Sequence, residues 1–492
     1  MKSLISIVLV LVMLFSFAAC SGGSADQPKD TTVSNDTTAS NPQNDIVYEE
    51  DDLPDDLRLG GEKITFLLPG QRTLNTEIFT DELNSDVVND SVYNREKYVE
   101  DRLDVELEAE YVSANEYEDV VEKQHASDDD IYQVLGYITF AFTRFVFTDY
   151  LNDLNQLNYI DLEKPWWSQT FNEEAEIMDM QFVATGSLAL SLQRSMFAVF
   201  YNKTLADNYS DKHPELNELY DIVDRGEWTY DKFYELGSEI YVDNNGDDLK
   251  DMEDTFGIGF QGWVGADVIW SSFDIDILSH DEEGWFELAV PVEKMYSSLE
   301  RIHVLLNDTT GCFDPGHGDE NLDDLSAMMA ADNLLFMSNT LDAVESATMR
   351  NMQSDYGILP FPKYDDKQDN YYTYAHDSYT SFAIPKTCRN TDAAAAVLEA
   401  LASYSYRETN PNYFNVALKG KYMSDPQSRM MLDTVVNGFK VDAAWIYLET
   451  LGSKFPSSFR PSSDTSYATS YAKLSKQVTL MLKLYKSQTS FS

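Results

Sequence analysis

The pattern of hydrophobic and polar positions predicts short alternating strands and helices over most of the chain. Residues 64–68 form an apolar, β-rich run that ends at Pro69-Gly70, which indicates a buried strand followed by a turn. The spacing beyond it predicts a helix over 90–103 with Asp90 as its N-cap, a strand over 105–112, a helix over 117–125 and a strand over 131–135. Strands that alternate with helices in this way are typical of a parallel sheet.

A second block of elements begins after the Lys164-Pro165-Trp166-Trp167 segment. The pattern there predicts strands over 182–184, 197–201, 256–260, 334–337, 356–359 and 381–384, and helices that begin at Thr229 and cover 325–330, 392–403 and 467–485. About 430 of the 492 residues follow residue 60, and one core rarely grows beyond about 300 residues. We therefore expect two lobes.

The first twenty residues predict export. Met1-Lys2 is followed by an uncharged apolar stretch over 3–19 and by Ala18-Ala19-Cys20, which is typical of a secretory signal peptide. The end of this segment resembles the lipobox of bacterial lipoproteins, although Phe17 departs from its preferred Leu. That resemblance implies a signal peptide over 1–19, lipid attached at Cys20 and palmitate in the anchor. An ordinary secreted protein or a single membrane span are the alternatives.

The stretch that follows is polar and acidic. Residues 21–45 consist almost entirely of Ser, Gly, Thr, Asn, Asp, Gln and Pro, and an acidic run occupies 49–56. Such a composition cannot bury enough apolar surface to fold. We therefore expect a disordered tether over 20–59 that joins the lipid to the folded part.

The net charge makes one class of partner unexpected, and the cysteines allow two interpretations. The formal net charge is −50, so nucleic acid is not expected as a partner, because phosphate binding requires a basic surface. Cys312 and Cys388 could pair in an extracytoplasmic compartment or stay as two buried free thiols, and the second interpretation is favoured.

One loop has the spacing of a calcium site. Side-chain oxygens occupy loop positions 1, 3, 5, 9 and 12, and a backbone carbonyl would serve at position 7, so the candidate ligands are Asp243, Asn245, Asp247, Leu249, Asp251 and Asp254. The loop resembles the calcium loop of dockerins and departs from EF-hands, which have Gly where Asp248 stands. A structural Ca²⁺ ion is expected, with a solvated acidic turn as the alternative.

Motifs of catalysis are missing from the sequence. It contains no Gly-x-Ser-x-Gly, no His-Glu-x-x-His and no Gly-x-x-x-x-Gly-Lys, and its six histidines have no metal-ligand spacing. Neither an enzymatic activity nor an organic cofactor is therefore expected. His376-Asp377 could touch a ligand from a loop near the hinge, or could lie in a surface loop.

Five segments together resemble the extracellular solute-binding proteins (family 1-like, carbohydrate type) of bacterial ABC transporters. They are NDSVYNREKYVEDRLDVEL (89–107), FAVFYNKTLADNY (197–209), WTYDKFYEL (228–236), YGILPFPKYDDKQDNYYTY (356–374) and SFAIPKT (381–387). The resemblance implies an α/β, two-lobed periplasmic-binding-protein-like fold (type II), with mixed sheets flanked by helices and hinge strands between the lobes. Lobe 1 would comprise 60–155 plus 365–403, and lobe 2 would comprise 156–364 plus 404–492.

The same resemblance implies a lipid-anchored receptor at the extracellular face of the cell membrane. It would capture a small polar solute, an oligosaccharide, and deliver it to an ABC transporter permease. Ligands of such sheets bind beyond the carboxyl ends of the strands, which favours Arg72, Tyr137, Trp263 and Trp270 as ligand-binding residues. A secreted carbohydrate-active hydrolase and a calcium-binding cell-surface adhesion protein are the alternatives.

Overall fold

The computed structural model describes residues 48–70, 77–316, 321–422, 426–447, 455–460 and 466–488. The chain divides into a unit over 1–47 and a unit over 48–492, and the structural description concerns the second unit. The predicted signal peptide, the lipid attachment at Cys20 and most of the predicted tether lie outside the described residues.

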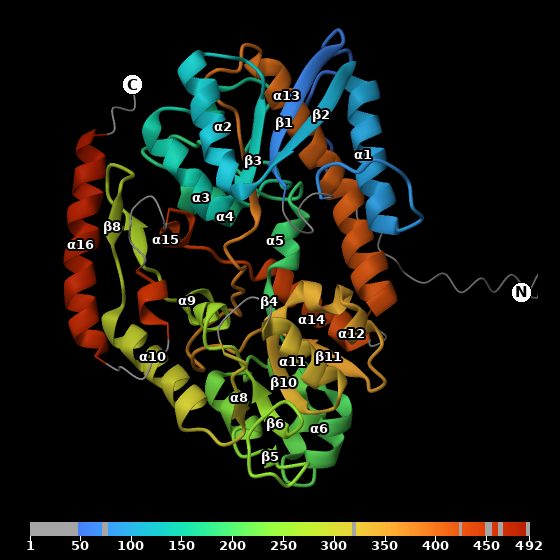
Figure 1. The fold of residues 1–492 in the computed structure, drawn as a ribbon, viewed down its shortest axis with the longest axis vertical. Coiled ribbons are helices and arrows are strands. Elements are labelled where there is room, and N and C mark those ends of the chain that lie inside the picture. Colours follow the sequence, from blue (N-terminus) through green and yellow to red (C-terminus); the bar gives the residue numbers. More distant parts are fainter. Residues whose placement is uncertain are drawn as a thin grey trace, which may run out of the picture. The chain divides into compact units, whose positions relative to one another are not determined.

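The first sheet contains four strands in the order β12-β3-β1-β2. Its strands are β1 (Glu62–Pro69), β2 (Val105–Val112), β3 (Val134–Ile138) and β12 (Thr380–Ala383). Strand β1 runs parallel to β2 and to β3, whereas β12 runs antiparallel to β3. Helices α1 (Val87–Leu103), α2 (Ala114–Ser127) and α13 (Thr391–Tyr404) flank this sheet (Figure 1). The parallel strand–helix order predicted from the sequence is confirmed.

The second sheet is built around β4 (Phe197–Asn202), β10 (Leu334–Thr340) and β6 (Thr255–Gly259). Its order is β11-β4-β10-β6-β5, with β11 (Tyr356–Leu359) at one edge, β5 (Tyr241–Val242) at the other and β9 (Cys312–Phe313) paired with β6. Strand β10 is parallel to β6 and antiparallel to β4, so this sheet is mixed.

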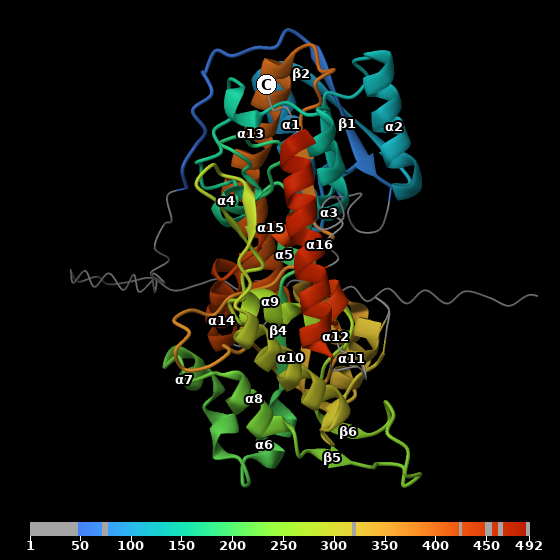
Figure 2. The same ribbon diagram turned by 90° about the vertical axis from the view of Figure 1, so that its left-hand side faces the viewer.

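The remaining elements cover and connect the two sheets. The helices are α3 (Thr139–Phe142), α4 (Gln169–Ala175), α5 (Leu190–Arg194), α6 (Lys203–Tyr209), α7 (Leu219–Asp224), α8 (Tyr230–Gly237), α9 (Val268–Ser272), α10 (Val292–Asn307), α11 (Asn321–Ala330), α12 (Ala347–Arg350), α14 (Pro426–Asn437), α15 (Ala443–Ile446) and α16 (Tyr467–Gln488). A two-stranded hairpin of β7 (Leu278–His280) and β8 (Phe286–Leu288) completes the fold. Helix α16 packs beside β8, as Figures 1 and 2 both show.

Two antiparallel segments connect the sheets. The Phe197 amide donates to the Tyr374 carbonyl, and the His376 amide donates to the Ser195 carbonyl. The short helix α5 precedes this crossing and lies between the two sheets in Figures 1 and 2. These segments have the arrangement expected of hinge strands.

Residues 166–186 contact the first sheet, although they follow the predicted lobe boundary at residue 155. Ala184 forms a β-bridge with Phe382 of β12, and the Trp167 indole donates to Glu399 of α13 at 2.9 Å. This segment therefore packs against the first sheet, although the prediction placed it in lobe 2. The lobe division that the resemblance implies stays a prediction, which these contacts do not support at its boundary at residue 155.

Several predicted element boundaries differ from the structure: the helix predicted over 117–125 is Ala114–Ser127, and the segment 182–184 is an isolated bridge instead of a strand. Helix α1 begins at Val87, three residues before the predicted start at residue 90. The Asp86 carboxylate accepts hydrogen bonds from the amides of Val88 and Asn89 and so takes the N-cap position that had been given to Asp90. Strand β3 begins at Val134 instead of residue 131, and the Ile131 side chain is exposed to solvent.

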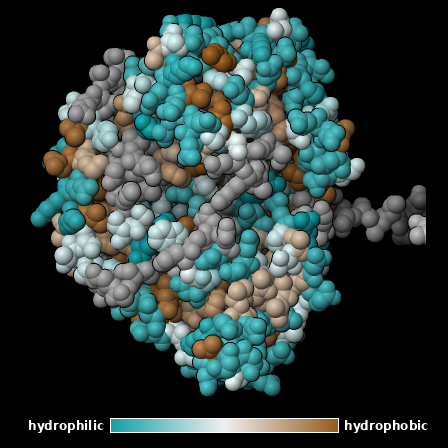
Figure 3. All heavy atoms as spheres, viewed as in Figure 1, coloured by the Kyte–Doolittle hydropathy of each residue, from teal (hydrophilic) through white to brown (hydrophobic). Residues whose placement is uncertain are grey.

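The state of the two described cysteines and the polarity of the surface agree with the expectations from the sequence. Cys312 and Cys388 are both buried free thiols. The side chains on the face shown in Figure 3 are predominantly hydrophilic over the first sheet, as the strongly acidic composition leads one to expect. Within the described ranges, every helix is too short or too polar to cross a membrane.

Candidate ligand cleft

A cavity of about 460 Å³ lies where the two sheets meet. Strand β3 of the first sheet contributes Ile138 and strand β10 of the second contributes Asn339 and Thr340, in each case at the carboxyl end of the strand. The loop that follows β6 contributes Val264. Carboxyl ends of strands are the usual site of ligands in open α/β sheets, because loops there vary without disturbing the core.

The connecting segments form another wall of this cavity. Helix α5 and the residue after it contribute Ser191, Arg194 and Ser195. The second connecting segment, which contains Tyr374 and His376, contributes His376 and Ser378. The cavity is therefore lined by both sheets and by the segments that join them. A ligand held here would contact every part of the chain that a hinge motion would move.

Arg194 carries a positive charge in the cavity wall and is already paired. Its guanidinium makes two contacts with the Glu345 carboxylate, at 2.9 and 3.2 Å, and lies 5.4 Å from the centre of the Tyr413 ring. The Tyr413 hydroxyl also donates to Glu345, at 2.9 Å. Burial alone would lower the pKa of Arg194, but the Glu345 carboxylate outweighs burial and raises it. The bidentate pair fixes the guanidinium as a rigid donor surface.

Two further carboxylates line the cavity. Asp323 lies in the first turn of α11, where the N-terminal end of the helix favours a negative charge. Asp342 accepts a hydrogen bond from the Thr340 hydroxyl at 2.5 Å. The surrounding chain desolvates the Asp342 carboxyl and raises its pKa, although the side chain stays exposed at the cavity.

Neutral polar groups complete the wall. The Asn339 amide donates to the Leu322 carbonyl at 3.0 Å and to the Ser326 hydroxyl at 3.1 Å, which joins the end of β10 to helix α11. The His376 Nδ1 and the Ser378 hydroxyl are 2.8 Å apart. Carboxylates, amides and hydroxyls held in this way can accept and donate hydrogen bonds to a hydroxyl-rich ligand.

Three of the four predicted ligand residues lie in the part of the chain that the structure describes, each in different surroundings. Arg72 lies outside the described residues. The Tyr137 side chain is buried, with its ring stacked on Tyr117 and its hydroxyl donating to the Ala114 carbonyl at 3.1 Å. Trp270 is buried against Phe455 and Phe459. A ligand-binding role for Tyr137 and Trp270 stays a prediction, which their burial does not support.

Trp263 fits the prediction better. Its side chain is 39% exposed, and the Arg460 guanidinium lies 4.5 Å from the centre of its ring. The next residue along the chain, Val264, lines the cavity. Tyr137 likewise precedes a lining residue, Ile138, but its side chain is buried, whereas that of Trp263 is partly exposed.

The predicted calcium loop connects β5 to β6. The Asp243 carboxylate accepts from the amides of Gly246 and Asp248, and Asp247 accepts from the amide of Leu249. Asp254 is buried and accepts from the Tyr241 hydroxyl at 3.1 Å. Backbone amides thus already occupy several of the predicted ligand oxygens. In the part of the chain that the structure describes, no three His, Cys, Asp or Glu side chains gather as a metal ion requires, and calcium binding stays a prediction.

The cavity residues that sequence analysis missed have no local signature. Arg194, Asn339 and Glu345 belong to a short helix, a strand end and a connecting turn, and no motif or spacing marks them. His376 had been considered as a ligand contact, and it does line the cavity. The available signal was positional: polar residues at the end of an apolar strand, as at Asn339 in β10, indicate the carboxyl edge of a sheet.

The architecture of the chain is the two-lobed α/β fold of the periplasmic-binding-protein type, with mixed sheets, flanking helices and crossing segments between them. Solved structures with this fold include the galacto-N-biose/lacto-N-biose I-binding protein of an ABC transporter from Bifidobacterium longum, in complex with lacto-N-biose. The match has a TM-score of 0.54 and 10% identity, and covers 87% of this chain and 98% of that one.

Two further structures are similar in the same way. A cyclo/maltodextrin-binding protein in complex with maltotetraose matches with a TM-score of 0.51 and 10% identity, over 88% of this chain and 98% of that one. An ABC transporter solute-binding protein from Thermotoga lettingae, bound to α-D-tagatose, matches with a TM-score of 0.50 and 12% identity, over 86% of this chain and all of that one. No family model matches the sequence. No curated protein sequence matches it either.

Proposed function

We propose that this chain is the substrate-binding receptor of an ABC importer and that it captures an oligosaccharide in the cavity between its two sheets. The observation that carries the proposal is the cavity itself, which gathers strand ends from both sheets and the crossing segments around one space. The solved structures with the same fold support it, because those named above are described as sugar-binding proteins or as solute-binding proteins with a bound sugar.

The chemistry of the wall favours a neutral, hydroxyl-rich ligand. Arg194 is neutralised by Glu345, and Asp323 and Asp342 add negative charge beside it. An anionic solute would therefore be repelled, whereas sugar hydroxyls can donate to the carboxylates and accept from the Asn339 amide. In this proposal the receptor binds its ligand and releases it unchanged.

The receptor is anchored to the extracellular face of the cell membrane in this proposal. The sequence supports an anchor through the apolar segment before Cys20 and the polar stretch after it. Lipid on Cys20 would hold the protein beside its permease, and the tether would leave the two sheets free to open and close.

Isothermal titration calorimetry against a panel of oligosaccharides tests the proposal with a matched pair of variants. Asp323→Asn removes a carboxylate from the cavity wall, and Asp324→Asn removes the neighbouring carboxylate in the same helical turn, which does not line the cavity. A hydrogen bond to a charged group contributes about 1.5–3 kcal/mol, so Asp323→Asn should weaken sugar binding about tenfold or more.

Asp324→Asn should leave the dissociation constant within about twofold of the parent, because Asp324 does not line the cavity. It is a matched control, since both variants remove the same charge from the same end of α11. Equal losses in both variants would show that the effect is general electrostatics and would remove the cavity from the proposal. A folded protein that binds none of the sugars would refute the choice of an oligosaccharide.

A further inference from the structure

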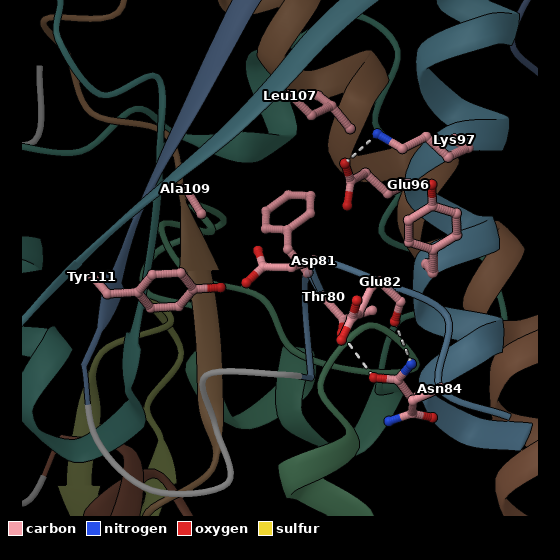
Figure 4. A pocket seen from close by; sticks show the side chains of 12 residues that line it. Thr80, Asp81, Glu82, Asn84, Glu96, Lys97, Leu107, Ala109 and Tyr111 are labelled. Carbon is pink, nitrogen blue, oxygen red and sulfur yellow. Dashed lines mark hydrogen bonds and ion pairs between the residues drawn. The ribbon is translucent and has the colours of Figure 1, made fainter. Parts of the chain in front are cut away.

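A second, larger cavity of about 750 Å³ lies on the first sheet, apart from the strand ends that form the cleft. Strand β2, helix α1 and residues 79–84 enclose it (Figure 4). It shares no lining residue with the cavity between the sheets. We call it the outer groove, and a ligand bound there would be separate from one in the cleft.

The floor of the outer groove is apolar. Leu107 and Ala109 point into it from alternate positions of β2, and Phe79 adds an aromatic ring. Leu107 is buried beneath α1, whereas Ala109 is only half-buried and Tyr111 is 38% exposed. The cover that α1 gives to this face of β2 thus ends along the groove, and a strip of apolar surface remains open.

The rim of the outer groove is acidic and aromatic. Glu96 pairs with Lys97 at 2.8 Å, and the Lys97 ammonium lies 5.7 Å from the centre of the Tyr93 ring. One ammonium group of the chain itself is therefore held between a carboxylate and a tyrosine ring at this rim.

Asp81 and Glu82 also lie at the rim, but unlike Glu96 they have no described lysine or arginine paired with them. In the described part of the chain, Asp81 and Glu82 make no ion pair, and both side chains are exposed. Figure 4 shows the Tyr111 hydroxyl pointing toward the Asp81 carboxylate. Burial, and after it the negative charges of Asp81, Glu96 and Glu77, together raise the pKa of Tyr111 to about 12. The described residues at this end of the groove therefore carry negative charge.

We propose that the outer groove binds an aliphatic polyamine, with its methylene chain on the apolar floor and its ammonium groups at Asp81 and Glu82. Alkyl stems pack on apolar surface while their charged ends stay at the rim, as lysine side chains do on protein surfaces. The described residues bring no metal-ligand cluster together here, so the spread charge suits an extended organic cation better than a single metal ion.

The affinity should be modest and sensitive to salt. Exposed ion pairs are individually weak and are screened at physiological ionic strength, where the Debye length is about 8 Å. The site does not depend on the proposed receptor function, because it involves different lining residues and a ligand of different charge.

Calorimetric titration of the purified chain with spermidine, at low salt and at 0.15 M salt, tests the proposal. The double variant Asp81→Asn with Glu82→Gln should raise the dissociation constant at least tenfold and weaken its dependence on salt. The matched control is Glu106→Gln with Asp119→Asn, which removes one Glu and one Asp from exposed positions that do not line the groove. Spermidine affinity should be unchanged in this control.

Two outcomes would overturn the proposal. The first is the absence of saturable spermidine binding to the folded parent protein. The second is an equal loss of affinity in both double variants, which would assign the binding to the general negative charge of the chain. Hexane-1,6-diol, which has a similar alkyl chain and no charge, should not compete with spermidine, and competition would likewise contradict the role of the two carboxylates.

Discussion

Glu399 offers a direct test of how burial controls ionisation in this fold. It lies in α13 and is only 3% exposed, and one of its oxygens accepts a hydrogen bond from the Trp167 indole at 2.9 Å. Burial raises the pKa of this carboxyl from 4.5 to about 7, although the bond from Trp167 acts in the opposite direction. Glu399→Gln keeps an oxygen acceptor for the indole and removes the ionisation.

The sign of the effect follows from proton binding. Between pH 4.5 and about 7 the folded protein keeps the proton on Glu399 while the unfolded chain releases it. The unfolded state then binds fewer protons, so the stability of the parent protein falls as pH rises through this range. At 1.36 kcal/mol per pH unit, the difference corresponds to about 3 kcal/mol. Above about pH 8 both states are ionised and the difference stays constant.

Urea denaturation at pH 4, 5.5, 7 and 8.5 measures the effect in the parent protein and in Glu399→Gln. The variant should gain about 3 kcal/mol relative to the parent between the lowest and highest pH. Glu163 is exposed and lies four residues before Trp167 in the sequence. The difference in unfolding free energy between Glu163→Gln and the parent should therefore not change with pH. A difference between Glu399→Gln and the parent that does not change with pH would refute the reasoning, because it would mean that folding does not alter the pKa of this carboxyl.

Three further predictions concern the anchor, the loop and the cleft. Cys20→Ser should release the folded protein from the membrane fraction, since the lipid would have no attachment point; retention seen by immunoblotting would count against the lipoprotein interpretation. Asp243→Ala combined with Asp247→Ala should abolish a rise in melting temperature on addition of millimolar calcium, which a bound ion provides by stabilising only the folded state; identical melting curves of the parent with calcium and with chelator would exclude the ion. Trp263→Ala should weaken sugar binding more than tenfold in calorimetry with little loss of stability, because its ring is partly exposed; unfolding with unchanged residual affinity would return this residue to the core.

Much of the fold could be predicted because local pattern determines it. The apolar runs at β1, β10 and β11 and the alanine-rich α13 are buried in the structure as their patterns require. The N-cap of α8 at Thr229 was also predicted, and its hydroxyl accepts from the Lys232 amide. The start of α1 was missed because Asp86 and Asp90 are both good capping residues, and only the hydrogen bonds decide between them.

The candidate site was predicted less well, for a physical reason. Its wall is assembled from segments as distant in the sequence as Ile138, Arg194, Asn339 and His376. Such a wall depends on how two sheets meet, and no single stretch of sequence encodes that. Tryptophan is equally suited to a core and to a sugar-binding surface, which is why Trp270 was a reasonable candidate although it lies in the core.

The central claim is that the cavity between the sheets holds an oligosaccharide. Native mass spectrometry of the purified protein, incubated with a mixed oligosaccharide library, tests it most directly. The account predicts one sugar adduct per chain, which is lost in Asp323→Asn and retained in Asp324→Asn. A folded protein that forms no sugar adduct, or whose adduct persists equally in both variants, would contradict the account.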